Sequence, residues 1–265
     1  MKKLLFFGSA MVLLLAFTGT SALAAPKDTC DGPISGSHGS LTVTGACTVT
    51  DDLTINGNLT LADGSVLAAA GSEVHVTGNI KVGKGAQLLL GWNAPEGKVG
   101  PDVVDGNIVA NQPLALYIGN VTVHGNVVSN GGGSADRFYN FPIKDNVIDG
   151  NLVIHGWTGG WWGVIANTVG GNVDLSHNQS VVHPADDSAC EGTFPAGCDA
   201  APGPDPDAAE VQSRSISDVV DNPQHISGNL ICHANTPAAQ VNPIDGGGAN
   251  IVDGKAIGEC SGLVD

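Results

Sequence analysis

Aromatic and basic side chains are both scarce in this chain of 265 residues. Aromatic residues make up 5% of it, so any hydrophobic core must be built mainly from aliphatic side chains. Only 10 Lys and Arg stand against 26 Asp and Glu, which gives a net charge of −16. A surface this acidic argues against nucleic acid and against anionic lipid surfaces as partners.

Long hydrophobic runs are also missing, apart from one at residues 4–17. That run follows Lys2 and Lys3 and precedes the small-residue sequence Ala22-Leu23-Ala24, a pattern typical of a secretory signal peptide. We therefore expect a signal peptide at 1–24 and one domain at 25–265, exported and with no further membrane span. The exported chain would keep 8 basic residues against 26 acidic ones, a net charge of −18.

The sequence holds no Cys-x-x-Cys motif, which disfavours a cysteine metal site, although it contains six cysteines. In an exported chain, six cysteines predict three disulfides. Proximity along the chain favours the following pairs: Cys30 with Cys47, Cys190 with Cys198, and Cys232 with Cys260. The first and last pairs would hold the two ends of the domain.

Glycine, by contrast, is abundant at 38 residues, and much of it lies in a repeated frame. In each copy Val or Ile stands two residues before a Gly-Asn pair, and Val, Ile or Leu follows it. The clear copies are Gly57-Asn58, Gly78-Asn79, Gly106-Asn107, Gly125-Asn126, Gly150-Asn151, Gly171-Asn172 and Gly228-Asn229. Intervals near 20 residues with apolar alternation indicate a solenoid built from strands.

The repeat predicts an all-β fold, a right-handed parallel β-helix with loop insertions. Stacked coils would place the Asn side chains above one another, where their amides can form a hydrogen-bonded ladder. The expected inward-facing residues are Ile55, Leu59, Val76, Ile80, Val123, Val127, Ile148, Leu152, Ile226 and Leu230. The alternative is an antiparallel sandwich in which the Gly-Asn pairs form hairpin turns.

Four segments interrupt the repeat and are predicted to be loops: 91–102, 131–144, 157–163 and 183–214. The last is rich in Pro and in acidic residues, and Pro disfavours strand pairing. Its carboxylates make calcium a candidate ligand, the alternative being that they are simply solvated.

Both ends of the domain resemble a group of secreted bacterial Gly-Asn-repeat proteins of unassigned function. The resemblance rests on Cys30-Asp31-Gly32-Pro33 at the start and on the segment from Ser227 to Cys232 at the finish. It implies export and a right-handed parallel β-helix of the pectate-lyase-like kind, but it brings no catalytic residues. Lys255 departs from the pattern, which would have a further Asn there.

Three residues that each precede a Gly-Asn pair are the candidate catalytic group: Asp105, His124 and Asp149. Stacking would align them in one column, where they could perform acid–base chemistry or bind a metal. The alternative is a solvated polar column, because Asn56 and Thr77 occupy the same position in other coils.

Three tryptophans form the one local concentration of a rare residue: Trp157, Trp161 and Trp162. Exposed, they could stack on sugar rings or anchor a protein partner. The alternative is that they pack against the apolar side of the solenoid.

Two functional classes follow. The leading one is an exported, non-catalytic structural or interaction protein of the bacterial cell envelope or extracellular space. The other is a carbohydrate-binding or polysaccharide-degrading protein, which as an enzyme would be a lyase or glycoside hydrolase. The sequence leaves the glycan, the protein partner and the oligomeric state open.

Overall fold

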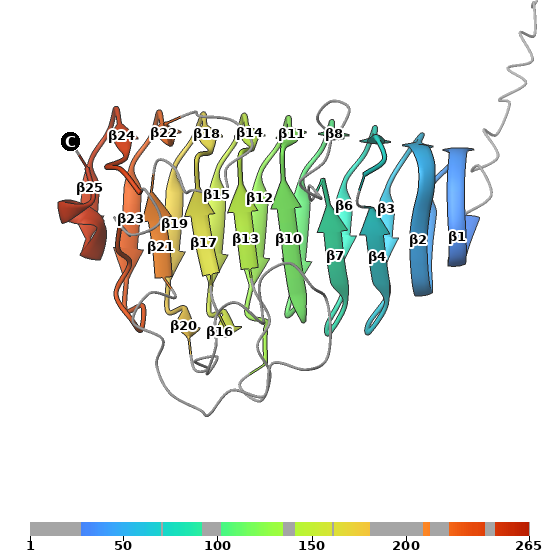
Figure 1. Ribbon diagram of the computed structural model, residues 1–265, viewed down its shortest axis with the longest axis horizontal. Helices are drawn as coiled ribbons and strands as arrows, with labels where there is room; N and C mark the ends of the chain where they lie inside the picture. The colour runs from blue at the N-terminus through green and yellow to red at the C-terminus, as the bar shows by residue number, and fades with distance from the viewer. Residues whose placement is uncertain are drawn as a thin grey trace, which may run out of the picture.

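The protein is all-β, with parallel strands stacked along one long axis (Figure 1). The computed structural model describes residues 28–69, 71–91, 102–134, 141–160, 162–180, 209–212, 223–241 and 247–264. The predicted signal peptide, Trp161 and the pair Cys190 and Cys198 lie outside these residues. Every strand pairing in the described part is parallel, so the antiparallel sandwich is wrong and a β-solenoid accounts for the repeat.

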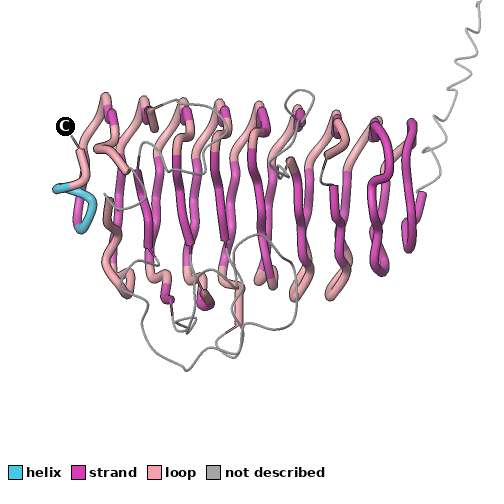
Figure 2. The backbone as a smooth tube through the Cα atoms, viewed as in Figure 1, coloured by secondary structure: helices cyan, strands magenta, loops and turns pink. Residues whose placement is uncertain are grey.

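Each coil of the solenoid contributes strands to three ladders, here called faces A, B and C (Figure 2). Face A holds β5 (Val74–Val76), β8 (Asp102–Val104), β11 (Val121–Val123), β14 (Val147–Ile148), β18 (Thr168–Val169), β22 (His225–Ile226) and β24 (Ile251–Val252). Face B holds β3 (Leu59–Leu61), β6 (Ile80–Val82), β9 (Ile108–Asn111), β12 (Val127–Asn130), β15 (Leu152–His155), β19 (Val173–Ser176), β23 (Leu230–His233) and β25 (Ala256–Gly258). Face C holds β4 (Val66–Ala69), β7 (Gln87–Leu90), β10 (Ala115–Gly119), β13 (Phe141–Lys144), β17 (Trp162–Ile165) and β21 (Ala209–Gln212).

The solenoid begins with two long strands, β1 (Asp28–His38) and β2 (Leu41–Ile55), that run around the first coils without a break. Successive parts of β2 pair with β3, β4 and β5, so this one strand starts all three faces. A short pair, β16 (Thr158–Gly159) with β20 (Gln179–Ser180), extends the corner between faces B and C. The C-terminal end carries a 3-10 helix, η2 (Glu259–Gly262).

Alternating side chains on each strand point into one continuous core. All ten residues expected to face inward are buried, from Ile55 to Leu230, which confirms the predicted register of the repeat. Because each strand of a parallel ladder stacks in register on its neighbour, one-residue slips would turn this whole set outward.

The Gly-Asn pairs lie at the corner between faces A and B and form the predicted ladder. Asn107 shows the geometry: its backbone N and its Nδ2 both donate to Oδ1 of Asn79, at 2.9 Å each. Asn126, Asn151, Asn172 and Asn229 repeat this arrangement in later coils. The glycines are required by close stacking, since a Cβ on Gly150 would lie 2.6 Å from Oδ1 of Asn126 and 2.7 Å from O of Gly125.

A second ladder, which the sequence did not predict, is buried where face C turns into face A. It consists of the buried residues Asn146, Asn167, Gln224 and Asn250. The side-chain amide of each of the first three donates to the side-chain oxygen of the next. The same column is apolar in earlier coils, at Leu53, Val74 and Val121, apart from the buried Asp102. Asp102 accepts a bond from the backbone N of Val74 at 2.9 Å, so it serves the stack in the same way.

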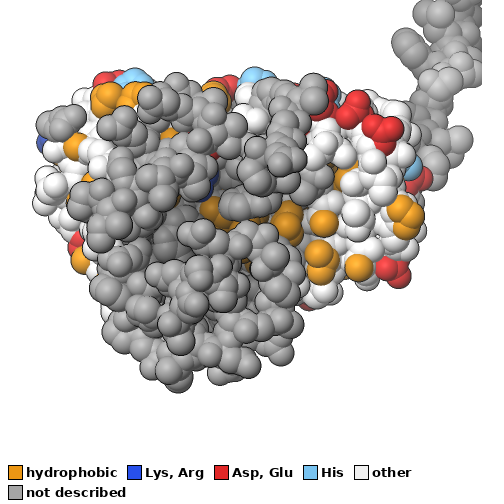
Figure 3. Space-filling model, in the orientation of Figure 1, with side chains coloured by type: hydrophobic (Ala, Val, Ile, Leu, Met, Phe, Trp, Pro, Cys, Tyr) orange, Lys and Arg blue, Asp and Glu red, His pale blue; other side chains and the backbone are white. Residues whose placement is uncertain are grey.

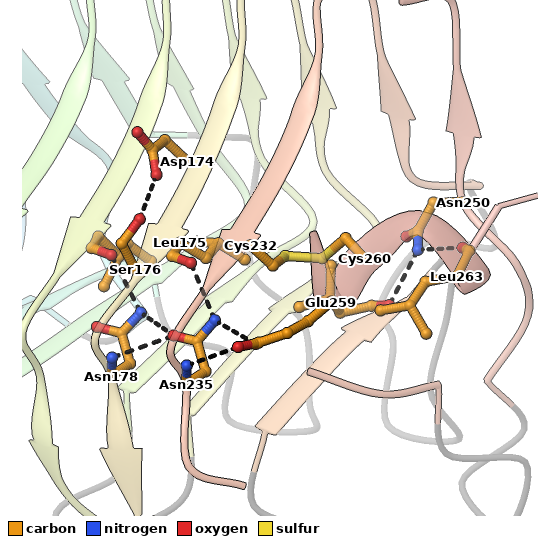
Figure 4. The surroundings of a disulfide bond; sticks show 12 residues. Asp174, Leu175, Ser176, Asn178, Cys232, Asn235, Asn250, Glu259, Cys260 and Leu263 are labelled. Atoms are coloured by element: carbon orange, nitrogen blue, oxygen red, sulfur yellow. Dashed lines mark hydrogen bonds between the residues drawn. A yellow bond between two sulfur atoms is a disulfide. The ribbon is translucent and has the colours of Figure 1, made fainter. Parts of the chain in front are cut away.

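A third ladder at the corner between faces B and C ends at a carboxylate. Asn178 donates to Asn235, and Asn235 donates through its backbone N and its Nδ2 to the two oxygens of Glu259, at 3.0 and 2.9 Å (Figure 4). A carboxylate only accepts hydrogen bonds when ionised, so Glu259 closes the chain of amide donors at the last coil.

Disulfides join the terminal coils to their neighbours. Cys30 of β1 pairs with Cys47 of β2, and Cys232 of β23 pairs with Cys260 of η2, as predicted (Figure 4). Among the described residues no cysteine is free. Terminal repeats of a solenoid lack one stacking neighbour, so these bonds strengthen the two places where stacking is weakest.

Three of the predicted loops are partly wrong. Segment 131–144 ends in the strand Phe141–Lys144, and 183–214 contains Ala209–Gln212, which pairs with β17 on face C. Segment 157–163 is no insertion, because Thr158–Gly159 form β16 and β17 begins at Trp162. The interval of 21 residues between Gly150 and Gly171 already equals that between Gly57 and Gly78, and leaves no room for an extra loop.

Candidate functional site

Asp105, His124 and Asp149 lie in one column on the outer side of face A, as the repeat predicted. Each follows the last inward-facing residue of β8, β11 or β14, and the register of those strands stacks the three positions in successive coils. Neighbouring strands in a ladder lie about 4.8 Å apart, close enough for side chains in adjacent coils to bond.

The structure joins these residues in a pattern that the column alone did not reveal. His124 Nδ1 lies 2.7 Å from Oδ2 of Asp149, and the two side chains are 50% and 54% exposed. Asp105 instead bonds His75, whose Nε2 lies 3.2 Å from its Oδ2. The sequence did not indicate His75, because it lies two residues before Thr77, the residue that occupies the column of Asp105 in that coil. The side chain of His75 therefore reaches Asp105 by a diagonal contact.

The carboxylates around His124 raise the pKa of its imidazole above the ordinary value. The largest cause is the hydrogen bond to Asp149, and the negative charges of Asp149 and Asp105 act in the same direction, while partial loss of hydration opposes them. A raised pKa means that the folded protein favours the protonated imidazole of His124, the group that could serve as a general acid.

Similar His–Asp pairs occur elsewhere on the outer surface. His225 lies 3.2 Å from Asp253 on face A, and His155 lies 3.2 Å from Asp174 on face B. His38 pairs with Asp28 at 3.1 Å within β1. The sequence shows these histidines at unlike positions in the repeat, so only the structure reveals that each stands beside an aspartate.

The column containing His124 also holds residues without such chemistry. Gly170 and Ser227 take the same position in later coils, as Asn56 and Thr77 do in earlier ones. In the described part of the chain no group of three or more His, Cys, Asp or Glu is arranged to hold a metal ion. The acidic segment proposed as a calcium ligand falls, apart from β21, outside the described residues.

Trp157 and Trp162 are core residues and do not form a recognition surface. Trp157 and Trp162 are both 0% exposed, and the ring centroids of Trp157 and Phe141 lie 4.6 Å apart. Trp162 stands beside Phe141 in the face C ladder, so these aromatic rings lie together in the core. The expectation that Trp157 and Trp162 bind a partner is therefore wrong, because a fully buried indole presents no surface.

A shallow depression of about 400 Å³ lies at the corner between faces B and C. It is lined by Lys84, Gly85, Gln112, Gly131, Gly132, Gly133, Gly156 and Thr158. Backbone N–H groups in its floor already donate within the fold, as Gly85 does to O of Gln112 and Gly131 to O of His155. The glycines here serve stacking, since a Cβ on Gly132 would lie 2.5 Å from O of Pro113.

Fold and site together define an all-β solenoid whose face A carries paired histidines and aspartates. No family model, curated protein or solved structure matches this chain. The described residues contain no helix with the length and hydrophobicity that crossing a membrane requires.

Proposed function

We propose that this protein is an exported, non-catalytic structural or interaction protein of the bacterial cell envelope or extracellular space. We further propose that its solenoid is a right-handed parallel β-helix of the pectate-lyase-like kind. The observation that carries the first proposal is the covalent fastening of both terminal coils, Cys30 to Cys47 and Cys232 to Cys260. Disulfides of this kind form and persist in oxidising compartments outside the cytosol.

The interior of the solenoid supports a structural role. Amide ladders run along all three corners, and the ladder at the C-terminal end closes on Glu259. The Gly-Asn ladder links successive coils from Asn58 to Asn229, and the other two ladders link the later coils, which favours one rigid arrangement. A rigid rod with a large outer surface suits a protein that spaces or presents binding surfaces.

Export and oxidation are tested together by intact-mass analysis of the protein recovered from the producing cells. We expect a chain that begins near Ala25, found outside the cytoplasm, with no cysteine alkylated under denaturing conditions before reduction. An uncleaved cytoplasmic chain, or an alkylated cysteine in the native sample, would contradict the proposal.

A second candidate function is a carbohydrate-binding or polysaccharide-degrading activity on face A. It is favoured by the bonded pair His124 and Asp149 with Asp105 alongside, because a histidine oriented by a carboxylate can act as a general base. The tryptophan cluster no longer supports it through Trp157 and Trp162, since both are buried.

One experiment separates the two functions. A glycan array and a panel of lyase and hydrolase substrates are applied to the mature protein, with and without calcium. The leading proposal expects no turnover. Turnover that Asp149→Asn abolishes, while Asp253→Asn at the distant pair with His225 preserves it, would replace the leading proposal by the second.

A further inference from the structure

One column of side chains runs along the outer side of face B, here called the face B stripe. The register of β2 and of the eight face B strands places one residue of each coil in it, between inward-facing neighbours. None of its residues is buried, and Val109 and Ile257 are each 39% exposed. In chain order the stripe consists of Thr42, Thr60, Lys81, Val109, Val128, Val153, Asp174, Ile231 and Ile257.

Face B carries little charge, although the protein is acidic. Its eight strands hold one Lys and one Asp, Lys81 and Asp174, and no Arg or Glu. By contrast, acidic and histidine side chains are visible along the upper edge of the space-filling view, above the strands of face A (Figure 3). Two copies of this acidic chain would therefore repel each other less through face B than through face A.

The order of residues in the stripe is self-complementary about Val128. Lys81 lies two coils before Val128, and Asp174 lies two coils after it. Val109 and Val153 fill the positions between. Beyond the two charges β-branched residues continue on both sides, as threonine toward the N-terminus and isoleucine toward the C-terminus. A two-fold interface requires such a pattern, because each half of the surface meets the other half of the second copy.

Lys81 and Asp174 cannot neutralise each other within one chain, because four coils separate them by roughly 19 Å at the usual spacing of strands. Lys81 is exposed and forms no ion pair with the residues that the structure describes. Asp174 accepts a bond from Oγ of Ser176 at 2.6 Å and lies 3.2 Å from Nε2 of His155. Among the described residues both of these contacts are to Oδ1, so Oδ2 can accept a bond from outside the chain.

We propose that face B is a dimerisation surface, on which a second copy of this chain packs with its solenoid axis antiparallel to the first. The two-fold axis lies in the interface, parallel to β12 at Val128. Lys81 of each copy then lies opposite Asp174 of the other. Val109 lies opposite Val153, and Val128 lies opposite its own counterpart. Apolar side chains pack in the middle, and the two ion pairs fix the register of one copy on the other.

The dimensions of the stripe suit a dimer of modest affinity. Its nine positions span about 38 Å at about 4.8 Å between strands, and a strand of four residues covers about 13 Å across the face. Each copy would bury about 500 Å², or about 1,000 Å² for the pair, which is close to the lower limit of a specific interface. We therefore expect association at micromolar concentrations and above.

The first test measures the molecular mass of the mature protein by sedimentation equilibrium over a series of micromolar concentrations. The parent protein is expected to show a monomer–dimer equilibrium. Val128→Asp brings two carboxylates together on the two-fold axis and should raise the dissociation constant by about tenfold or more. Val147→Asp is the matched control, an exposed valine on face A, and should leave the equilibrium unchanged. Circular dichroism verifies that both variants stay folded.

The second test exchanges the two charges. Lys81→Asp and Asp174→Lys, each alone, place like charges opposite each other on both sides of the apolar centre, so each should weaken the dimer. The double variant restores opposite charges at both places and should recover most of the affinity of the parent. Weakening in the single variants together with recovery in the double variant identifies the antiparallel arrangement.

Three results would overturn the proposal: a parent protein that stays monomeric at every concentration, a dimer that Val128→Asp leaves intact, or a double variant that binds no better than the single ones. Glycan binding by a monomer, lost in Val128→Asp but kept in Val147→Asp, would also overturn it and would assign face B to carbohydrate. The dimer depends on the residues of face B and not on export or on the lack of catalysis. Its failure would therefore leave the proposed function in place.

Discussion

Two amide ladders at different corners of the solenoid perform the same task in opposite surroundings. The Gly-Asn ladder between faces A and B is reached by solvent along much of its length, as at Asn58, Asn79 and Asn229. The ladder between faces C and A is closed to solvent, and Asn167, Gln224 and Asn250 are 0% exposed. The bonds have similar lengths, so the surroundings should decide what each ladder contributes.

The two ladders differ in what can replace a hydrogen bond that a mutation removes. At the exposed corner water can reach an amide or carbonyl group that loses its partner, so the net loss is small. In the buried ladder no such replacement exists, and an orphaned group bears its full desolvation cost. The buried ladder is therefore the more sensitive of the two, although it shows no repeated motif in the sequence.

The largest effect is expected for Asn167→Leu in the buried ladder. Asn167 accepts from the N and Nδ2 of Asn146 at 3.1 and 2.9 Å, and donates to O of Ile143 at 2.8 Å. Leucine has a similar volume but leaves these groups without partners. At about 1–3 kcal/mol for each orphaned group, we expect a loss of about 3–5 kcal/mol in the free energy of unfolding. Urea denaturation measures it.

Val121→Leu, in the same column where the chain is already apolar, is the control: it leaves no polar group without a partner, and overpacking alone should cost about 1–3 kcal/mol. If Asn167→Leu were as mild as that control, burial would not be what distinguishes the two ladders.

The next effect is expected at the glycine of the exposed ladder, from Gly150→Ala. The added methyl group would lie 2.6 Å from Oδ1 of Asn126 and 2.7 Å from O of Gly125, a backbone atom that cannot rotate away. Overpacking of this kind typically costs about 1–3 kcal/mol. Thermal melts should show a clear decrease in the midpoint. Gly64→Ala tests only backbone conformation, because Gly64 has a φ of 72° and nothing within 4 Å of a built Cβ.

These glycines explain which ladder the sequence could predict. At the exposed corner the coils approach so closely that only Gly fits, so Gly-Asn recurs as a fixed pair and the ladder is visible in the sequence. At the buried corner the residue before the amide varies, as with Ala166 before Asn167 and Pro223 before Gln224. With Leu53 and Val74 in the same column, no repeated motif marks that ladder.

The candidate site, like the ladders, could be predicted from the sequence only in part. The repeat correctly aligned Asp105, His124 and Asp149, because residues at one position of successive coils must stack. It could not predict that Asp105 bonds His75, since side-chain direction decides a diagonal contact. Segment 157–163 was predicted to be a loop that interrupts the repeat, so its tryptophans were expected to be accessible. The unchanged coil length was the contrary signal.

A smaller loss is expected for Asn126→Leu in the exposed ladder, the direct counterpart of Asn167→Leu. Asn126 accepts from the N and Nδ2 of Asn151 at 2.8 and 3.0 Å and donates to Oδ1 of Asn107 at 2.9 Å. These bonds are only partly buried, so we expect a smaller loss of about 1 kcal/mol, close to the net value of an ordinary hydrogen bond. A loss in urea denaturation as large as that of Asn167→Leu would remove the distinction between the ladders.

The smallest expected effect is a gain, from Lys255→Asn at the last coil. Here the exposed ladder stops: the backbone N of Lys255 donates to Oδ1 of Asn229 at 2.9 Å, but no amide side chain follows. Asparagine would add the Nδ2 bond that earlier coils have, as between Asn229 and Asn172 at 3.1 Å. Because the site is exposed and terminal, we expect a gain of about 0.5–1 kcal/mol or less.

Lys255→Ala is the control that removes the ammonium group without adding an amide. A higher thermal midpoint for Lys255→Asn than for Lys255→Ala would show that the ladder can be lengthened by one rung. Equal midpoints would mean that side-chain amide bonds contribute nothing at the exposed corner, and that its stability comes from the backbone bonds and the close-packed glycines alone.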